Sequence, residues 1–247
     1  MDHFVITGCA RSGTGYMASL FTHLGLETQH ETVFSPYSQG FEGWSTAPGE
    51  SSWLAAPFIH ELPPGTIVLH QIRHPLSVVQ SLLGIRFFAS DATQVGRNIR
   101  SLAQVARARG SMGVARRLIS GRWRGRGKRL RSDFFRFVEH HCPEVFEADD
   151  EATRCSRYWV GWNRLVEEEA EQADVVYMRY RIEEVDAAFV TNVLGLLGQS
   201  VDEVRVVDAI GRLPTDLNTR SPGSIQDLPS PVSPELVTLA RGYGYSL

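Results

Sequence analysis

Residues 3–17 read HFVITGCARSGTGYM, and this stretch decides the fold. The apolar run at 3–7 predicts a short buried strand, and the small residues and glycines at 8–15 predict a tight loop. Apolar residues then return at helical spacing: Tyr16, Met17, Leu20, Phe21 and Leu24. A strand, a glycine-rich loop and a helix in this order point backbone N–H groups and a helix N-terminus at one place, where they attract a phosphate group.

The loop has the skeleton of a nucleotide-binding P-loop but lacks two of its residues. Gly8 and Gly13 have the G-x-x-x-x-G spacing, whereas the next two positions are Thr14 and Gly15. A nucleoside triphosphatase needs lysine there for the β- and γ-phosphates, and then serine or threonine for magnesium. This loop has its cation at Arg11 instead. The residues favour phosphate binding and argue against hydrolysis of ATP or GTP; a strand-to-helix turn without a ligand is the alternative interpretation.

The rest of the chain alternates strands and helices. Strands are expected at 27–31, 66–72 and 174–179, and helices at 53–62, 75–83, 155–166, 183–197 and in a final segment that ends at Arg241. Residues 35–51 are rich in Ser, Gly and Pro and predict a loop. The pattern predicts one domain over 1–247 with a three-layer α/β architecture and a mostly parallel central sheet, like that of P-loop NTPases.

The composition narrows the class of protein. The 247 residues are 43% hydrophobic and 21% charged with a net charge of −3, which is typical of a soluble globular protein and not of a polycation. No apolar run approaches the roughly 20 residues of a membrane-spanning helix, and the N-terminus lacks a secretory pattern. Cys9, Cys142 and Cys155 fit neither a disulfide framework nor a zinc site. We expect a cytoplasmic, metal-independent protein with no membrane partner.

A second set of polar residues follows the strand predicted before Arg73. Arg73 closes that strand, and Pro75 stands at the first position of the next helix. Ser77 and Ser81 lie one turn apart on one face of this helix. Because ligands of parallel sheets gather at the carboxyl ends of the strands, where Gly8 and Arg73 both stand, the loop and the second set are expected to face one crevice.

Together the two segments resemble those of sulfotransferases that use 3′-phosphoadenosine 5′-phosphosulfate (PAPS). Residues 5–17, VITGCARSGTGYM, contain the family's first motif, [KR]-S-G-T-T, except at its last place, where Gly15 stands. Residues 69–83, LHQIRHPLSVVQSLL, contain its second motif, R-x-P with a serine eight residues after the arginine. The resemblance covers 1–90 well and the remainder loosely. It implies transfer of the sulfuryl group of PAPS to a hydroxyl or an amine of a small-molecule or carbohydrate acceptor.

The resemblance also implies which residues hold PAPS. The first motif and its flanks would bind the 5′-phosphosulfate: Gly8, Ala10, Arg11, Ser12, Gly13, Thr14, Gly15 and Tyr16. Arg73 and Ser81 would bind the 3′-phosphate, and Tyr180 resembles a tyrosine that contacts the adenine, although the residues after it depart from the family's segment. Arg11 would be catalytic, because a guanidinium and a row of N–H donors can stabilise the negative charge that develops on the departing phosphate.

The acceptor must lose a proton as it attacks, so a base is expected near the loop. Glu31, just after the second predicted strand, is the main candidate, since some sulfotransferases that this chain resembles have a glutamate at a comparable point; His30 beside it is the second. Others use a histidine from the third strand, where this chain has His70, but a histidine within TIVLHQI is better explained as a core residue with satisfied hydrogen bonds. Trp159 and Trp162 are likewise expected in the core, given their helical spacing.

The basic residues gather in one segment. Residues 97–136 hold 13 basic residues and one acid and are expected to form an irregular excursion from the domain. Three interpretations fit this segment. It is a solvated excursion without a ligand, it attracts an anionic acceptor or the PAPS anion, or it binds RNA. Few aromatic residues interleave with the arginines and the rest of the chain is acidic, which argues against nucleic acid as a partner. A P-loop small-molecule kinase is the other alternative, and neither the acceptor nor the oligomeric state is readable from the sequence.

Overall fold

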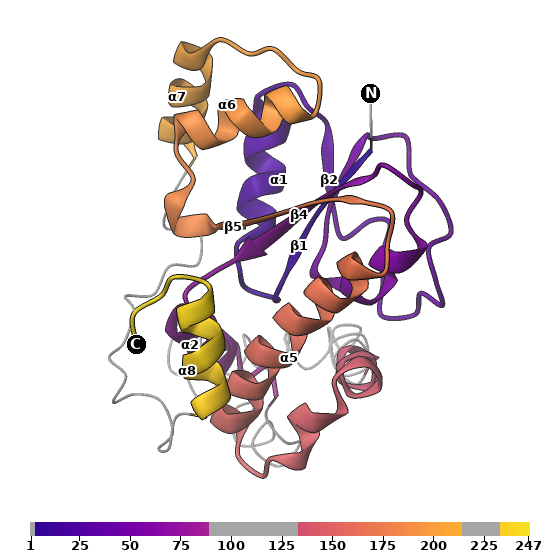
Figure 1. Cartoon of the computed structure of the whole chain (residues 1–247), viewed down its shortest axis with the longest axis vertical. Helices are drawn as coiled ribbons and strands as arrows, with labels where there is room; N and C mark the ends of the chain where they lie inside the picture. Colours follow the sequence, from indigo (N-terminus) through magenta and orange to yellow (C-terminus); the bar gives the residue numbers. More distant parts are fainter. Residues whose placement is uncertain (1–2, 89–132, 214–232) are drawn as a thin grey trace, which may run out of the picture.

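The computed structural model describes residues 3–88, 133–213 and 233–247. They form an α/β structure around a five-stranded sheet of order β2-β3-β1-β4-β5, in which all neighbouring strands are parallel (Figure 1). The strands are β1 (Phe4–Gly8), β2 (Thr28–His30), β3 (Gly49–Ser51), β4 (Ile67–Ile72) and β5 (Val176–Arg181). Because helices flank the sheet, the predicted three-layer α/β fold with a parallel central sheet is confirmed.

The helices divide between the two faces of the sheet. One face is covered by α1 (Thr14–His23), α6 (Ala187–Leu196) and α7 (Glu203–Arg212). The other is covered by the 3₁₀ helix η1 (Trp53–Glu61), α2 (Pro75–Ile85), α5 (Glu151–Glu171) and α8 (Pro234–Gly242). Two short 3₁₀ helices, η2 (Pro143–Glu147) and η3 (Ile182–Glu184), precede α5 and α6.

The two central strands are buried along their whole length. In β1, Phe4 and Ile6 pack into the core beneath α1, and Val5 packs into the core around α5. Burial on both faces is typical of parallel sheets and explains the nearly continuous apolar runs in the sequence. The polar side chains of β4, His70 and Gln71, are therefore buried and need hydrogen-bond partners within the protein.

Residues 49–51 form strand β3, so the loop predicted over 35–51 is wrong at its end. Gly49 lies opposite Phe4 of β1 on one side and opposite Thr28 of β2 on the other. A Cβ atom at Gly49 would overlap the ring of Phe4, so the close approach of the strands requires glycine there. Three residues show no apolar period in the sequence, and this strand exists because it has a partner on each side.

Two predicted helices also differ from the structure. The segment predicted at 53–62 is the 3₁₀ helix η1, and Pro57 within it has no N–H for an α-helical hydrogen bond. The helix predicted at 183–197 is divided, because a new helix begins behind Asp186, whose carboxylate caps it. The start of α2 is as predicted, with Pro75 in the first turn.

The arginine-rich segment lies almost entirely outside the described residues. Of the excursion predicted at 97–136, only 133–136 are described, within a stretch that is helical from 133 to 141. The interpretations of this segment stay predictions, as does the single domain over 1–247. In the described ranges no helix is long and apolar enough to cross a membrane, and no group of His, Cys, Asp and Glu side chains is placed to hold a metal ion.

Candidate anion-binding site

The loop between β1 and α1 takes a backbone path that two glycines permit. Gly8 has φ +155°, and a Cβ atom there would run into the carbonyl oxygen of Gln71 on β4. Gly13 has φ +104° and is the N-cap of α1. Both conformations disfavour any residue with a side chain. The loop therefore turns sharply at the carboxyl end of β1 and directs the start of α1 toward the same end of the sheet.

Several backbone amides of this loop remain available to a ligand. The Ser12 amide donates to the carbonyl oxygen of Cys9 (3.0 Å), and the Ala10 amide donates to the Tyr158 hydroxyl (2.9 Å). The amides of 13–15 donate to no acceptor among the described residues, as expected at the first turn of a helix. The Ser12 hydroxyl is buried and also has no partner among the described residues. Unsatisfied donors at a helix N-terminus fit an anionic group such as a phosphate.

The two sequence motifs meet at this loop. The Arg11 Nε atom donates to the Ser81 hydroxyl on α2 at 2.9 Å, and a terminal nitrogen of Arg73 donates to the Arg11 carbonyl oxygen at 3.1 Å. Burial lowers the pKa of Arg73, and the nearby Glu183 carboxylate and Tyr245 hydroxyl raise it, so the guanidinium remains a cation. Residues some 60 to 70 positions apart in the sequence are thereby placed next to each other at the carboxyl end of the sheet.

Helix α5 supports both motifs through adjacent aromatic residues. Tyr158 accepts the Ala10 amide, and the Trp159 indole N–H donates to the carbonyl oxygen of Arg73 at 3.0 Å. Both side chains are fully buried, which confirms the prediction that Trp159 belongs to the core. Trp162 is also buried, and its indole N–H donates to the Trp53 carbonyl oxygen. The core prediction was correct, but it missed that Tyr158 positions the loop and that Trp159 positions Arg73.

A glutamine of β4 links the loop to β5. The Gln71 side chain donates from Nε2 to the Ser12 carbonyl oxygen at 2.7 Å and accepts the Tyr180 hydroxyl at 2.6 Å. Tyr180 is buried, and its ring packs against Phe189. The structure therefore gives Tyr180 a packing and positioning role, whereas contact with an adenine stays a prediction. The sequence analysis did not select Gln71, because Gln71 belongs to neither motif. A polar residue within an apolar strand could have indicated its role.

The two candidate bases stand at the end of β2. Glu31 is exposed, has φ +53° and donates its amide to the Ser51 carbonyl oxygen. Arg11 also has a left-handed backbone, with φ +74°, and the third such non-glycine residue in the described ranges, Arg86, is the C-cap of α2. A helix cap accounts for Arg86, but no cap accounts for Arg11 and Glu31. Left-handed conformations of non-glycine residues cost energy and gather at functional sites.

A buried carboxylate that the sequence analysis missed supports the turn after β2. Glu50 of β3 accepts the Thr32 amide at 2.9 Å, and its other oxygen is buried without a partner among the described residues. Burial raises the pKa of Glu50, and the Glu31 carboxylate nearby raises it further. Glu50 thus holds the backbone on which Glu31 sits. Its position within an unrecognised strand explains why no pattern pointed to it.

Ser51 and Ser52 lie at and just after the carboxyl end of β3, and their hydroxyls bond to α1 and η1. The Ser51 hydroxyl donates to the Thr14 carbonyl oxygen at 2.8 Å, and the Ser52 hydroxyl caps η1 by accepting the Leu54 amide. Both residues are fully buried. Ser51 therefore ties the carboxyl end of β3 to the first residue of α1.

His70 is a core residue, as predicted. It is fully buried; the Tyr177 hydroxyl donates to Nδ1, and Nε2 lies 3.1 Å from the Asn163 side-chain oxygen. That oxygen can only accept, because the Asn163 amide nitrogen donates to the Trp159 carbonyl, so Nε2 carries the proton. Burial lowers the pKa of His70 to about 3. A neutral, fully bonded imidazole has no free nitrogen for an acceptor's proton.

The last residues of the chain pack beside Arg73. The Tyr245 hydroxyl donates to one oxygen of Glu183 at 2.7 Å, and the His74 amide donates to the other at 2.8 Å. The His74 ring and the Arg181 guanidinium both lie against the Tyr245 ring. Glu183 therefore connects the start of α2 to the C-terminal segment.

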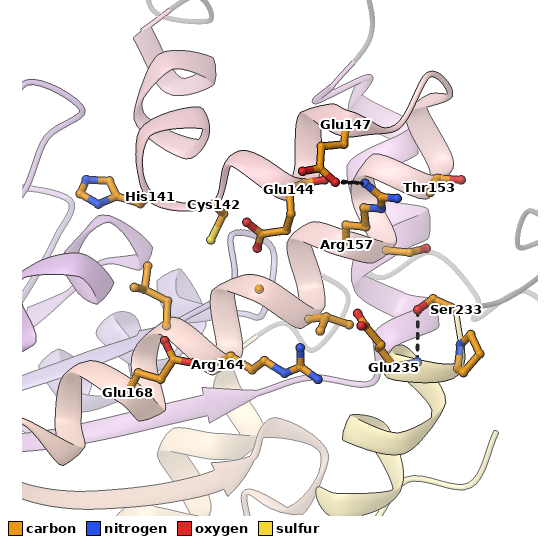
Figure 2. A pocket seen from close by; sticks show the side chains of 15 residues that line it. His141, Cys142, Glu144, Glu147, Thr153, Arg157, Arg164, Glu168, Ser233 and Glu235 are labelled. Atoms are coloured by element: carbon orange, nitrogen blue, oxygen red, sulfur yellow. Dashed lines mark hydrogen bonds and ion pairs between the residues drawn. The ribbon is translucent and has the colours of Figure 1, made fainter.

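A separate pocket of about 870 Å³ lies between η2, α5 and the start of α8 (Figure 2). Its walls include Arg157, Gly161, Arg164 and Glu168, which recur at helical spacing on one face of α5. From other sides of this helix Tyr158 points toward the loop and Trp159 points toward Arg73. The pocket is thus separated from the loop by α5, and neither Arg11 nor Arg73 lines it.

In comparisons with known proteins, no family model, curated protein or solved structure matches the chain.

Proposed function

We propose that this protein transfers the sulfuryl group of PAPS to a hydroxyl or an amine of a small-molecule or carbohydrate acceptor. In this reaction the acceptor oxygen or nitrogen bonds to sulfur while the bond from sulfur to the bridging phosphate oxygen breaks. The electron pair of that bond stays on the bridging oxygen, and the acceptor's proton passes to a base. The products are the sulfated acceptor and adenosine 3′,5′-bisphosphate.

The observation that carries the proposal is the junction of Arg11, Ser81 and Arg73. A donor with two separated anionic groups needs two cationic positions, one at the loop and one at the start of α2. The bonds from Arg11 to Ser81 and from Arg73 to the Arg11 carbonyl place these positions next to each other. Arginine binds phosphate oxygens with paired N–H groups, which suits both positions.

The proposal assigns a task to each group. The amides of 13–15 and the Arg11 guanidinium stabilise charge on the departing phosphate. Arg73 and Ser81 hold the 3′-phosphate, and the exposed Glu31 carboxylate accepts the proton. Thr14 and Gly15 stand where a kinase would need lysine and a magnesium-binding hydroxyl, so the residues favour sulfuryl transfer over a P-loop kinase.

Calorimetry with nucleotides tests the proposal without knowledge of the acceptor. In the presence of a chelator, the protein should bind adenosine 3′,5′-bisphosphate roughly ten- to a hundredfold more tightly than AMP, because a charge-assisted bond to the second phosphate stabilises the complex by about 1.5–3 kcal/mol. Arg73→Ala should abolish that preference. Arg212→Ala, which changes an arginine at the exposed end of α7, should keep it.

Two other outcomes would favour the alternatives. Magnesium-dependent binding of ATP that exceeds binding of the bisphosphate would overturn the sulfotransferase and support a small-molecule kinase. Tight binding of RNA that weakens steeply with salt, with no binding of either nucleotide, would support the RNA-binding alternative.

A further inference from the structure

Gly15 makes room for a side chain from the neighbouring strand. A Cβ atom at Gly15 would lie 3.0 Å from Nε2 of His30 and 3.2 Å from its Cδ2. Those distances are tighter than ordinary contact, so the imidazole occupies the space into which a larger residue at 15 would project. The one position where the first motif departs from its family is therefore filled by a nitrogen heterocycle.

The His30 ring lies beside donors that have no acceptor. It flanks the first turn of α1, where the amides of Thr14 and Gly15 donate to no described acceptor. In the described ranges the two ring nitrogens of His30 also have no hydrogen-bond partner, and the buried Ser12 hydroxyl in the same loop lacks one. The unpartnered Ser12 side chain is independent of the helix terminus, and both indicate a ligand with several acceptor oxygens.

The backbone of His30 is coupled to the loop through Ser51. His30 lies opposite Ser51 in the register of β2 and β3, and the Ser51 hydroxyl donates to the Thr14 carbonyl oxygen at 2.8 Å. The imidazole thus reaches Gly15 from a strand end that is tied to the same helix turn. Its position is set by sheet pairing, although the ring itself is exposed.

We propose that His30 is a binding residue that donates from Nε2 to an oxygen of the phosphosulfate, in place of the threonine hydroxyl that Gly15 lacks. This inference rests on the proposed function for the identity of the ligand. A nitrogen that donates its proton to the ligand cannot accept the acceptor's proton at the same time. The inference therefore assigns Nε2 of His30 to binding and keeps the Glu31 carboxylate as the main candidate base.

A pair of substitutions tests the replacement of one donor by another. His30→Ala should weaken binding of adenosine 3′,5′-bisphosphate about tenfold, because it removes one charge-assisted hydrogen bond. The double variant His30→Ala with Gly15→Thr has space for the threonine and restores a hydroxyl, so its affinity should return toward that of the wild type. His23→Ala serves as the matched control, since His23 and His30 line one pocket of about 570 Å³ and His23 stands at the far end of α1 from Gly15.

The outcomes separate this inference from the proposed function. If the wild type and His30→Ala bind the bisphosphate equally, or if only turnover falls in His30→Ala, His30 is not a binding residue although the function stands. Titration of inorganic sulfate, followed by the ¹⁵N signals of the His30 ring, gives a second readout. Sulfate that moves these signals in a protein that binds no bisphosphate would overturn the function and keep the anion-binding role. No response to either ligand would overturn both.

Discussion

The two candidate anion-binding segments are held in different ways. The loop at 8–15 is fixed from three sides by buried groups, namely the Tyr158 hydroxyl, the Gln71 amide and the Ser51 hydroxyl. The segment that begins at Arg73 bonds to the buried Trp159 indole and to Arg11, and the His74 amide bonds to the exposed carboxylate of Glu183.

Because of this difference, we expect the loop at 8–15 to be more rigid than the segment that begins at Arg73. A buried hydrogen bond cannot be exchanged for water without leaving a partner unsatisfied, so the loop keeps its shape before a ligand arrives. A contact with an exposed carboxylate is easily replaced by water. We therefore expect the loop to be preorganised for the reacting group and the Arg73 segment to adjust to the rest of the donor.

The largest effect is expected at Gly8. In Gly8→Ala the added Cβ atom would collide with the Gln71 backbone, which the sheet holds in place. We expect the free energy of unfolding to fall by about 4 kcal/mol or more, measured by urea denaturation.

Gly195→Ala is the control for this change, because a Cβ atom there meets nothing within 4 Å and lies in helix α6. Alanine in a helix should stabilise the protein by up to about 1 kcal/mol. Two variants of equal stability would show that the loop is not rigid.

Acid should lower the stability of the protein through β4, which leads into Arg73 and whose Gln71 bonds to the loop. Because burial lowers the pKa of His70 to about 3, the folded protein keeps this imidazole neutral while the unfolded chain binds a proton below its ordinary pKa near 6.5. Stability from His70 is therefore complete above pH 6.5 and is lost as the pH falls toward 3. At pH 4 the loss amounts to about 3 kcal/mol.

His70→Gln can keep both hydrogen bonds but does not titrate. Its unfolding free energy should fall less than that of the wild type between pH 7 and pH 4, as followed by urea denaturation at each pH. Parallel curves for the two proteins would contradict a neutral, buried His70.

The smallest effects compare the two segments directly, by removal of one hydroxyl from each. Tyr158→Phe leaves the buried Ala10 amide without an acceptor and should lower the free energy of unfolding by about 1–3 kcal/mol. Tyr245→Phe leaves Glu183 to water and should lower it by no more than about 0.5 kcal/mol. Equal losses, read from thermal unfolding of both variants, would remove the proposed difference in rigidity.

Local sequence patterns were sufficient to predict most of the strands and helices. Apolar period and glycine or proline at defined positions predicted the strands β1, β4 and β5, the helix behind Pro75 and the tight loop between β1 and α1. Strand β3 was missed because its three residues have no period of their own. The division of 183–197 into η3 and α6 was missed because Asp186 was not recognised as a helix cap.

The sequence by itself determined that two cationic segments follow neighbouring strand ends, because strand, loop and helix signals are local and parallel strands align their carboxyl ends. Only the tertiary structure decided what touches these segments. Tyr158 reaches Ala10 across 148 positions of the chain, and Arg11 meets Ser81 across 70. Sheet register and helix packing choose such partners, and the same long-range geometry places the His30 ring in the space that Gly15 leaves open.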